Sequence, residues 1–69
     1  MDRTYVASSN ISSIGYDENT QTLEVEFLNG SVYQYYNVPP NMNDQLMKEG
    51  SKGRFLNTYI KKSYPYSRV

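Results

Sequence analysis

The first half of the chain alternates between hydrophobic and polar residues. In TLEVEF, residues 22–27, every second side chain is apolar, which predicts a strand with one buried face. Apolar residues also mark a strand over 11–16, before the turn-forming residues 17–20. A third strand is expected over 32–38, and it ends at Pro39-Pro40 because proline cannot continue a ladder. This half therefore predicts a three-stranded antiparallel meander.

The second half follows helical spacing. Residues 40–50 predict a short helix with Met42, Leu46 and Met47 on its inner side and Gly50 as a left-handed stop. Residues 51–63 predict a second helix. Its inner stripe is Phe55, Leu56, Tyr59 and Ile60, and its outer side carries Arg54, Asn57 and Lys61.

Together these elements predict a single α+β domain spanning residues 1–69, with both helices packed on one face of the sheet. Residues 1–6 are expected to form a loose N-terminal tail. After Pro65 the chain can run back as an extended segment. A chain of this length buries only about 60% of the surface that its unfolded form exposes, so we expect no second core.

The central hairpin is expected to turn at Asn29-Gly30, and two registers are open. A two-residue turn places Tyr33 and Tyr35 on the open face of the sheet, beside two glutamates. A three-residue bulged turn moves both tyrosines to the core side, because a one-residue slip exchanges the faces. We expect the two-residue turn, with Tyr36 in the core and with Tyr33 and Tyr35 as candidates for stacking on nucleic-acid bases.

The amino-acid composition excludes several kinds of catalytic and metal-binding site. The chain has no cysteine and no histidine, so disulfides, thiolate or imidazole metal ligands and His- or Cys-based catalysis are absent. The carboxylates near the predicted strands, Asp17, Glu24 and Glu26, have no nucleophile–base partner, and so short a chain hardly builds a glycosidase cleft. We therefore expect a protein that is not an enzyme, with no cofactor and no metal.

The beginning of the chain, MDRTYVASSN, lacks the apolar core of a signal peptide. No apolar run is long enough to span a membrane. These two features predict a cytoplasmic protein without a membrane partner.

The net charge of zero conceals an uneven distribution. Residues 1–50 hold seven acids and two bases, a balance of −5, whereas residues 51–69 hold five bases and no acid, a balance of +5. Such an asymmetry is typical of a segment that binds nucleic acid or another anion. The plainer alternative is that the two halves pair their charges within the fold.

The sequence GSKGRFL, residues 50–56, adds a candidate anion site. Ser51 is expected to cap the helix, Gly53 to let an anion approach free N–H groups, and Lys52 and Arg54 to add charged contacts. In YIKKSYPYSRV, tyrosines and cations are interleaved, as on surfaces that stack bases and neutralise phosphates. The alternative for these residues is structural, as solvated charges and a cover for the core edge. The candidate set is Ser51, Lys52, Gly53, Arg54, Asn57, Lys61, Lys62, Tyr64, Tyr66 and Arg68.

The motifs SSNI, GYD, TLEVEF, NGSVYQYYNVPP and SKGRFLNTYIKKSYPYSRV, in this order and spacing, resemble the KTSC domain. This short module is found at the C-terminus of some lysyl-tRNA synthetases and as free-standing small bacterial proteins. Its hallmark, a central Tyr-x-Tyr, is matched by Tyr33-Gln34-Tyr35. The resemblance suggests RNA binding, partly through the attachment to a tRNA-charging enzyme, and it supplies no catalytic residues.

These observations predict a small non-catalytic binding module. The leading hypothesis is weak, largely sequence-independent binding of nucleic acid, RNA before DNA, through the basic segment, residues 51–69. The alternative is a protein–protein interaction module that docks its partner on an exposed sheet edge or on the tyrosine face.

Overall fold

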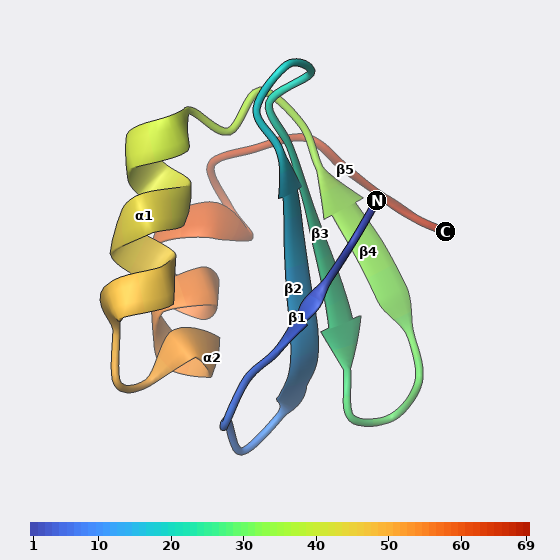
Figure 1. Ribbon diagram of the computed structural model, residues 1–69, viewed down its shortest axis with the longest axis vertical. Coiled ribbons are helices and arrows are strands. Elements are labelled where there is room, and N and C mark those ends of the chain that lie inside the picture. Colours follow the sequence, from blue (N-terminus) through green and yellow to red (C-terminus); the bar gives the residue numbers. More distant parts are fainter.

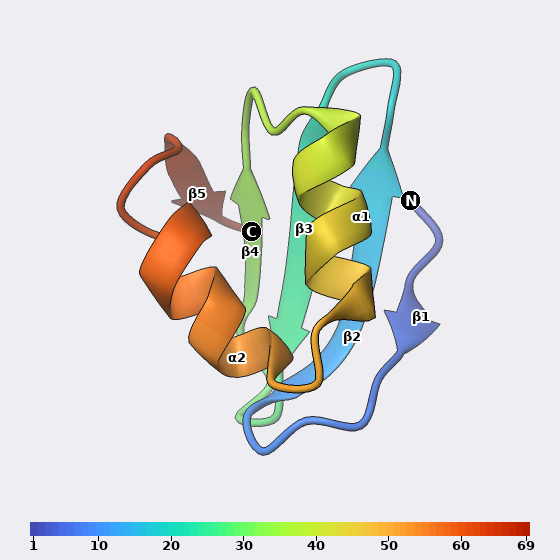
Figure 2. The ribbon, with the colours of Figure 1, turned by 90° about the vertical axis from the view of Figure 1, so that its left-hand side faces the viewer.

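The computed structural model describes the whole chain, Met1–Val69, as an antiparallel sheet with its helical segments on one face (Figure 1). The strands follow one another across the sheet in sequence order: β1 (Thr4–Tyr5), β2 (Ile11–Asp17), β3 (Thr22–Phe27), β4 (Val32–Tyr35) and β5 (Tyr66–Arg68). Between β4 and β5 the chain forms helix α1 (Pro40–Lys48), helix α2 (Lys52–Phe55) and the π-helical turn η1 (Leu56–Ile60). The α+β class is confirmed, and the expected meander has an additional strand at each edge (Figure 2).

The two additional strands come from the ends of the chain. The segment after Pro65 runs back as expected and pairs along β4, whereas the loose tail expected over residues 1–6 is wrong, because Thr4–Tyr5 pairs along β2. Arg3 reaches Glu24 on the outer face of the sheet, the face away from the helices, with 2.9 Å between Nη1 and Oε2. An added Cβ at Gly15 would lie 2.6 Å from the backbone oxygen of Asp2, so the N-terminal segment lies directly on this face.

Strand β2 contains a bulge that aligns its apolar residues with the core. The register shifts between Ile11 and Ser13, which leaves Ser12 as the extra residue. In a regular strand, Ile11 and Ile14 would point to opposite faces, since they are three positions apart. With the bulge both isoleucines are buried, at 0% and 3% exposure.

The hairpin between β3 and β4 turns through three residues, Leu28–Gly30, so the expected two-residue turn is wrong. The N–H of Gly30 donates to the carbonyl of Phe27, and the N–H of Phe27 donates to the carbonyl of Ser31, both at 2.9 Å. Gly30 has a φ of 92°, the left-handed conformation that closes a type I turn with a bulge. Asn-Gly is compatible with this turn as well as with the shorter one.

The three-residue turn places the tyrosines of the Tyr-x-Tyr motif on the helix side of the sheet. Tyr33 and Tyr35 each lie opposite a core residue of β3, and Tyr35 is only 2% exposed. Tyr36 points to the outer face instead, where its hydroxyl donates to the side chain of Gln34 at 3.2 Å. The expected positions of Tyr36 and of the two motif tyrosines are therefore reversed.

Helix α1 packs as its spacing predicts. Leu46 is fully buried, and Met42 and Met47 pack against the core. The helix ends at Lys48, and the next residue is extended, with φ −74° and ψ 139°. Gly50 does not have a positive φ, so the left-handed stop expected there is wrong.

The second helix widens after α2. In η1 the N–H of Lys61 donates to the carbonyl of Leu56 at 2.9 Å, a bond between residues five apart. Phe55, Leu56 and Ile60 are buried as expected, whereas Tyr59 is 54% exposed. The wider turn moves residue i+5 towards the side of residue i, so Lys61 faces the sheet rather than the outer side predicted from regular α-helical spacing.

The start of α2 packs against the loop that precedes β2. Ser51 occupies the N-cap position of α2 as predicted, but its side chain makes no capping hydrogen bond. Gly53 is buried, and an added Cβ would collide with Oδ1 of Asn10 and lie 3.0 Å from its Cγ. The close approach that Gly53 permits is thus made by the side chain of Asn10.

This contact predicts that Gly53→Ala lowers the free energy of unfolding by about 1–3 kcal/mol through overpacking, although alanine favours a helix by about 1 kcal/mol over glycine. In a double-mutant cycle followed by urea denaturation, Asn10→Ala should remove most of that loss. Gly50→Ala is the control, because nothing lies within 4 Å of its added Cβ. Equal losses for the two glycine variants would contradict the packing argument.

The register also predicts how much stability is lost when Tyr35 or Tyr36 is replaced by alanine. Tyr35→Ala should lower the free energy of unfolding by about 3–5 kcal/mol, as removal of a buried aromatic ring does. Tyr36→Ala should cost clearly less, because this ring is half-buried on the outer face. Thermal or urea unfolding of both variants measures the difference, and a larger loss at Tyr36 would show that the hairpin pairs in the other register.

Candidate functional site

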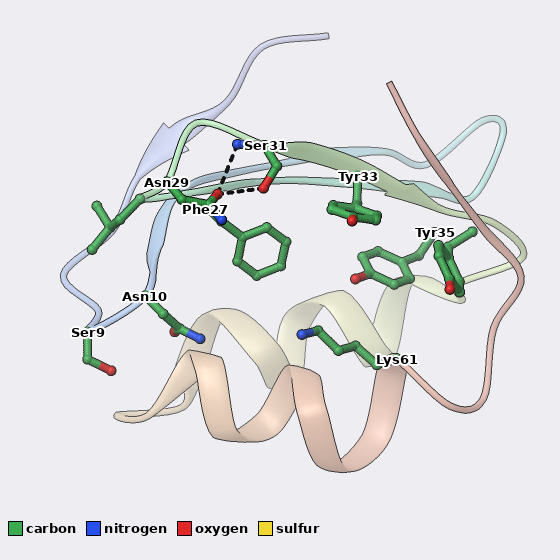
Figure 3. Close-up of a pocket in the computed structure, with 10 residues that line it drawn as sticks. Ser9, Asn10, Phe27, Asn29, Ser31, Tyr33, Tyr35 and Lys61 are labelled. Atoms are coloured by element: carbon green, nitrogen blue, oxygen red, sulfur yellow. Dashed lines mark hydrogen bonds between the residues drawn. The ribbon is translucent and has the colours of Figure 1, made fainter.

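A pocket of about 600 Å³ lies between the helix side of the sheet and η1 (Figure 3). This volume falls within the range of about 300–1,000 Å³ that is usual for small-molecule sites. We call it the aromatic pocket. Its lining residues are Ser9, Asn10, Phe27, Leu28, Asn29, Ser31, Tyr33, Tyr35, Lys61 and Tyr66.

Four aromatic rings form a continuous row along the pocket. Phe27 meets Tyr33 edge to face, with 5.8 Å between the ring centroids. Tyr66 lies 5.9 Å from both Tyr33 and Tyr35. The pairing of β4 with β5 produces this row, because Tyr66 lies opposite Tyr35 and cross-strand partners share a face. Tyr66 is 58% exposed, so the row opens to solvent at β5.

Lys61 supplies the charge of the pocket. Its side chain extends from the helical segment towards the rings (Figure 3), and Nζ lies 5.2 Å from the centroid of Phe27, within cation–π distance. Lys61 forms no ion pair, because both ion pairs of the protein use Arg3. No acidic residue lines the pocket, so this single positive charge is not neutralised there.

Tyr35 forms the most buried wall of the pocket. Burial raises the pKa of its hydroxyl to about 12, and the neighbouring Tyr33 and Tyr66 add to the shift. The phenol therefore stays protonated and uncharged throughout the physiological range. It offers a neutral hydroxyl rather than a phenolate to anything that enters.

The acidic residues nearest to these tyrosines in the sheet lie on its other face. Glu24 pairs with Arg3 and accepts a hydrogen bond from Nε2 of Gln34 at 2.8 Å. Glu26 accepts from the hydroxyl of Ser13 at 3.0 Å. The two-residue register would have placed these glutamates beside the motif tyrosines, where they would repel phosphate. In the observed register the sheet separates the two groups.

The structure brings together part of the predicted set. Tyr33, Tyr35, Lys61 and Tyr66 line the aromatic pocket, and Arg68 lies opposite Tyr33 in β5, on the same face of the sheet. The other members lie outside it. Four of them are exposed: Ser51, Arg54, Asn57 and Lys62. Gly53 is buried against Asn10, and Tyr64 packs against the core. Lys52 donates from Nζ to the carbonyl of Glu49 at 2.7 Å.

Sequence reasoning missed six lining residues. Phe27 could have been found from the three-residue register, which puts it on the same face as Tyr33. Leu28, Asn29 and Ser31 follow from the same turn. Ser9 and Asn10 belong to a loop without periodicity. Tertiary contacts hold this loop at the pocket: Gly53 packs against Asn10, and the N–H of Leu28 donates to the carbonyl of Asn10 at 2.9 Å.

Nowhere do three or more His, Cys, Asp or Glu side chains cluster in a way that could hold a metal ion. None of the helices has the length and apolar character needed to cross a bilayer.

Comparison with known proteins gives consistent matches. A lysine–tRNA ligase of Nostoc punctiforme is 39% identical over 59 residues, which is 86% of this chain and 10% of the ligase, so the chain spans a small part of that relative. An uncharacterized protein of Stutzerimonas stutzeri is 41% identical over 70 residues, covering 100% of this chain and 99% of its own length. The crystal structure of a KTSC domain protein from Yersinia pestis superposes with a TM-score of 0.93 at 39% identity, covering 99% of this chain and 96% of that one.

The family model agrees with these matches. The model described as the KTSC domain covers residues 7–64, which include the Tyr-x-Tyr hallmark and most of the aromatic pocket. Relatives that consist almost entirely of this domain, and a solved structure of the same fold, support the same assignment. The chain belongs to the KTSC domain family.

Proposed function

We propose that this domain is a non-catalytic module that binds single-stranded RNA through the aromatic pocket and the cations of the basic segment. The observation that carries the proposal is the composition of the pocket. Four aromatic rings and one unpaired lysine line it without any acidic residue. Aromatic faces that stack bases, together with cations that neutralise phosphates, are the usual means by which proteins hold single strands.

The five cations of the basic segment support the proposal. Lys52, Arg54, Lys61, Lys62 and Arg68 form no ion pair with the acids of the first half, so the charges of the two halves do not pair within the fold. They lie on α2, on the turn that follows η1 and on β5, at the side of the sheet away from β1 (Figure 2). Lys61 and Arg68 stand next to the aromatic row, where phosphates on both sides of a stacked base would lie.

The relatives add a second line of support. Lysine–tRNA ligases of three cyanobacterial strains carry a segment that is 36%, 38% or 39% identical to this chain, and their name states that they act on a transfer RNA. A domain that contributes to holding RNA fits such a protein. The same domain on its own, as in the Stutzerimonas relative, would then act as a free RNA-binding module.

Docking of a protein on a sheet edge has less support. The edge strands are Thr4–Tyr5 and Tyr66–Arg68, which offer few free backbone groups to an added strand. The tyrosine face that could have served the same purpose is covered by α2 and η1 on one side of the aromatic pocket. We therefore favour the nucleic acid as the partner.

The proposal predicts salt-dependent binding to a short oligouridine. If about four phosphates are neutralised, the slope of log K against log[salt] should be near −3, measured by fluorescence anisotropy. Lys61→Ala and Arg68→Ala should each reduce the slope by roughly 0.7, because each removes one phosphate contact. Lys48→Ala, on the exposed end of α1, is the matched control and should leave the slope unchanged. A slope near zero, or no binding at low salt, would overturn the proposal.

A further inference from the structure

The hydroxyl of Tyr35 has no hydrogen-bond partner within the protein. Two other tyrosines that are partly buried do have one, since Tyr16 donates to the carbonyl of Val38 and Tyr36 donates to Gln34. Tyr35 is more buried than either, at 2% exposure, and its hydroxyl points into the aromatic pocket (Figure 3). The hydroxyl oxygen itself is reached from the pocket, because it is not among the fully buried polar atoms that lack a partner. An unpaired hydroxyl on a pocket wall is therefore free to bond to a ligand that enters.

The other polar groups of the pocket are mainly hydrogen-bond donors. Oδ1 of Asn29 already accepts from the N–H and the hydroxyl of Ser31, and Oδ1 of Asn10 accepts from Ser8. Each amide thus keeps its NH₂ group free. The ammonium of Lys61 is also free to donate. A ligand that suits this pocket is flat and rich in acceptors.

We propose that the aromatic pocket holds a single nucleotide with a carbonyl-bearing base such as uracil. The base lies against the aromatic row, one of its carbonyl oxygens accepts a hydrogen bond from the hydroxyl of Tyr35, and its phosphate lies near Lys61. This inference rests on the proposed function, because it names the part of the RNA that enters the pocket. It adds a base preference, which contacts between cations and phosphates cannot provide.

The test is a titration of the ¹⁵N-labelled protein with UMP, followed by amide chemical shifts. We expect shifts centred on the Leu28–Gly30 turn, Asn10 and Lys61. Tyr35→Phe should weaken UMP binding about 5- to 10-fold, the usual effect of one lost hydrogen bond. Tyr36→Phe is the matched control: it removes a hydroxyl from the adjacent tyrosine on the outer face and should bind UMP like the unchanged protein.

Two further ligands test separately whether the base, and its carbonyl oxygen, are needed for binding. Ribose 5-phosphate should bind far more weakly than UMP, because it lacks the base. AMP should bind more weakly than UMP, because adenine has no carbonyl oxygen. The melting temperature of Tyr35→Phe should not fall, since the lost hydroxyl has no partner in the fold. An unchanged melting temperature would show that weaker UMP binding by this variant does not come from a loss of structure.

The outcomes distinguish this inference from the proposed function. Equal UMP affinity for Tyr35→Phe and the unchanged protein, or ribose 5-phosphate or AMP binding as tightly as UMP, would overturn the nucleotide pocket. If oligouridine nevertheless binds with the expected salt slope, the proposed function stands without it. If UMP binds as described and oligouridine shows no salt-dependent binding, the pocket is supported and strand binding fails.

Discussion

The three-residue turn at Leu28–Gly30 determines which face of the sheet carries each side chain of β4. Gly30 makes this turn possible, because its φ of 92° is a conformation that a glycine adopts without a Cβ clash. One residue fewer in the turn would exchange the faces and move Tyr33 and Tyr35 to the outer side, next to Glu24. The aromatic pocket, its lack of acidic residues and the burial of Tyr35 all depend on this one register.

A consequence of the register is that the core and the candidate site share residues. Tyr35 belongs to the hydrophobic core and also forms a wall of the pocket, and Phe27 and Tyr33 pack against that core. A chain of this size has little apolar surface to spare, so rings that line a pocket must also contribute to stability. Most large substitutions in the pocket will therefore change folding and binding together. Removal of a single hydroxyl is one of the few changes that can separate the two.

The parts of the fold that were predictable are those with a regular period. The alternation in β3 and the spacing of Met42, Leu46 and Met47 in α1 identified their elements and their inner faces. The turn did not identify the register, since Asn29-Gly30 suits either turn length. The strand carried the better signal, because the observed register gives the core Tyr33 and Tyr35, whereas the shorter turn would give it one tyrosine, Tyr36. The π-helical turn was also missed, because a 3.6-residue period has no way to signal one wider turn. The loop at Asn10 carries no period at all, and it is held at the pocket by tertiary contacts with Gly53 and Leu28.

The π-helical turn gives the pocket its charge. In a continuous α-helix Lys61 would have shared the side of Arg54, which is exposed, and would have pointed away from the aromatic row. With one wider turn, Nζ of Lys61 lies 5.2 Å from the ring of Phe27, while Ile60 stays in the core. A purely apolar groove would favour any hydrophobic ligand, and a row of cations alone would favour any anion. A cation held over aromatic rings favours a ligand that is flat at one end and negative at the other, which is the chemical form of a nucleotide.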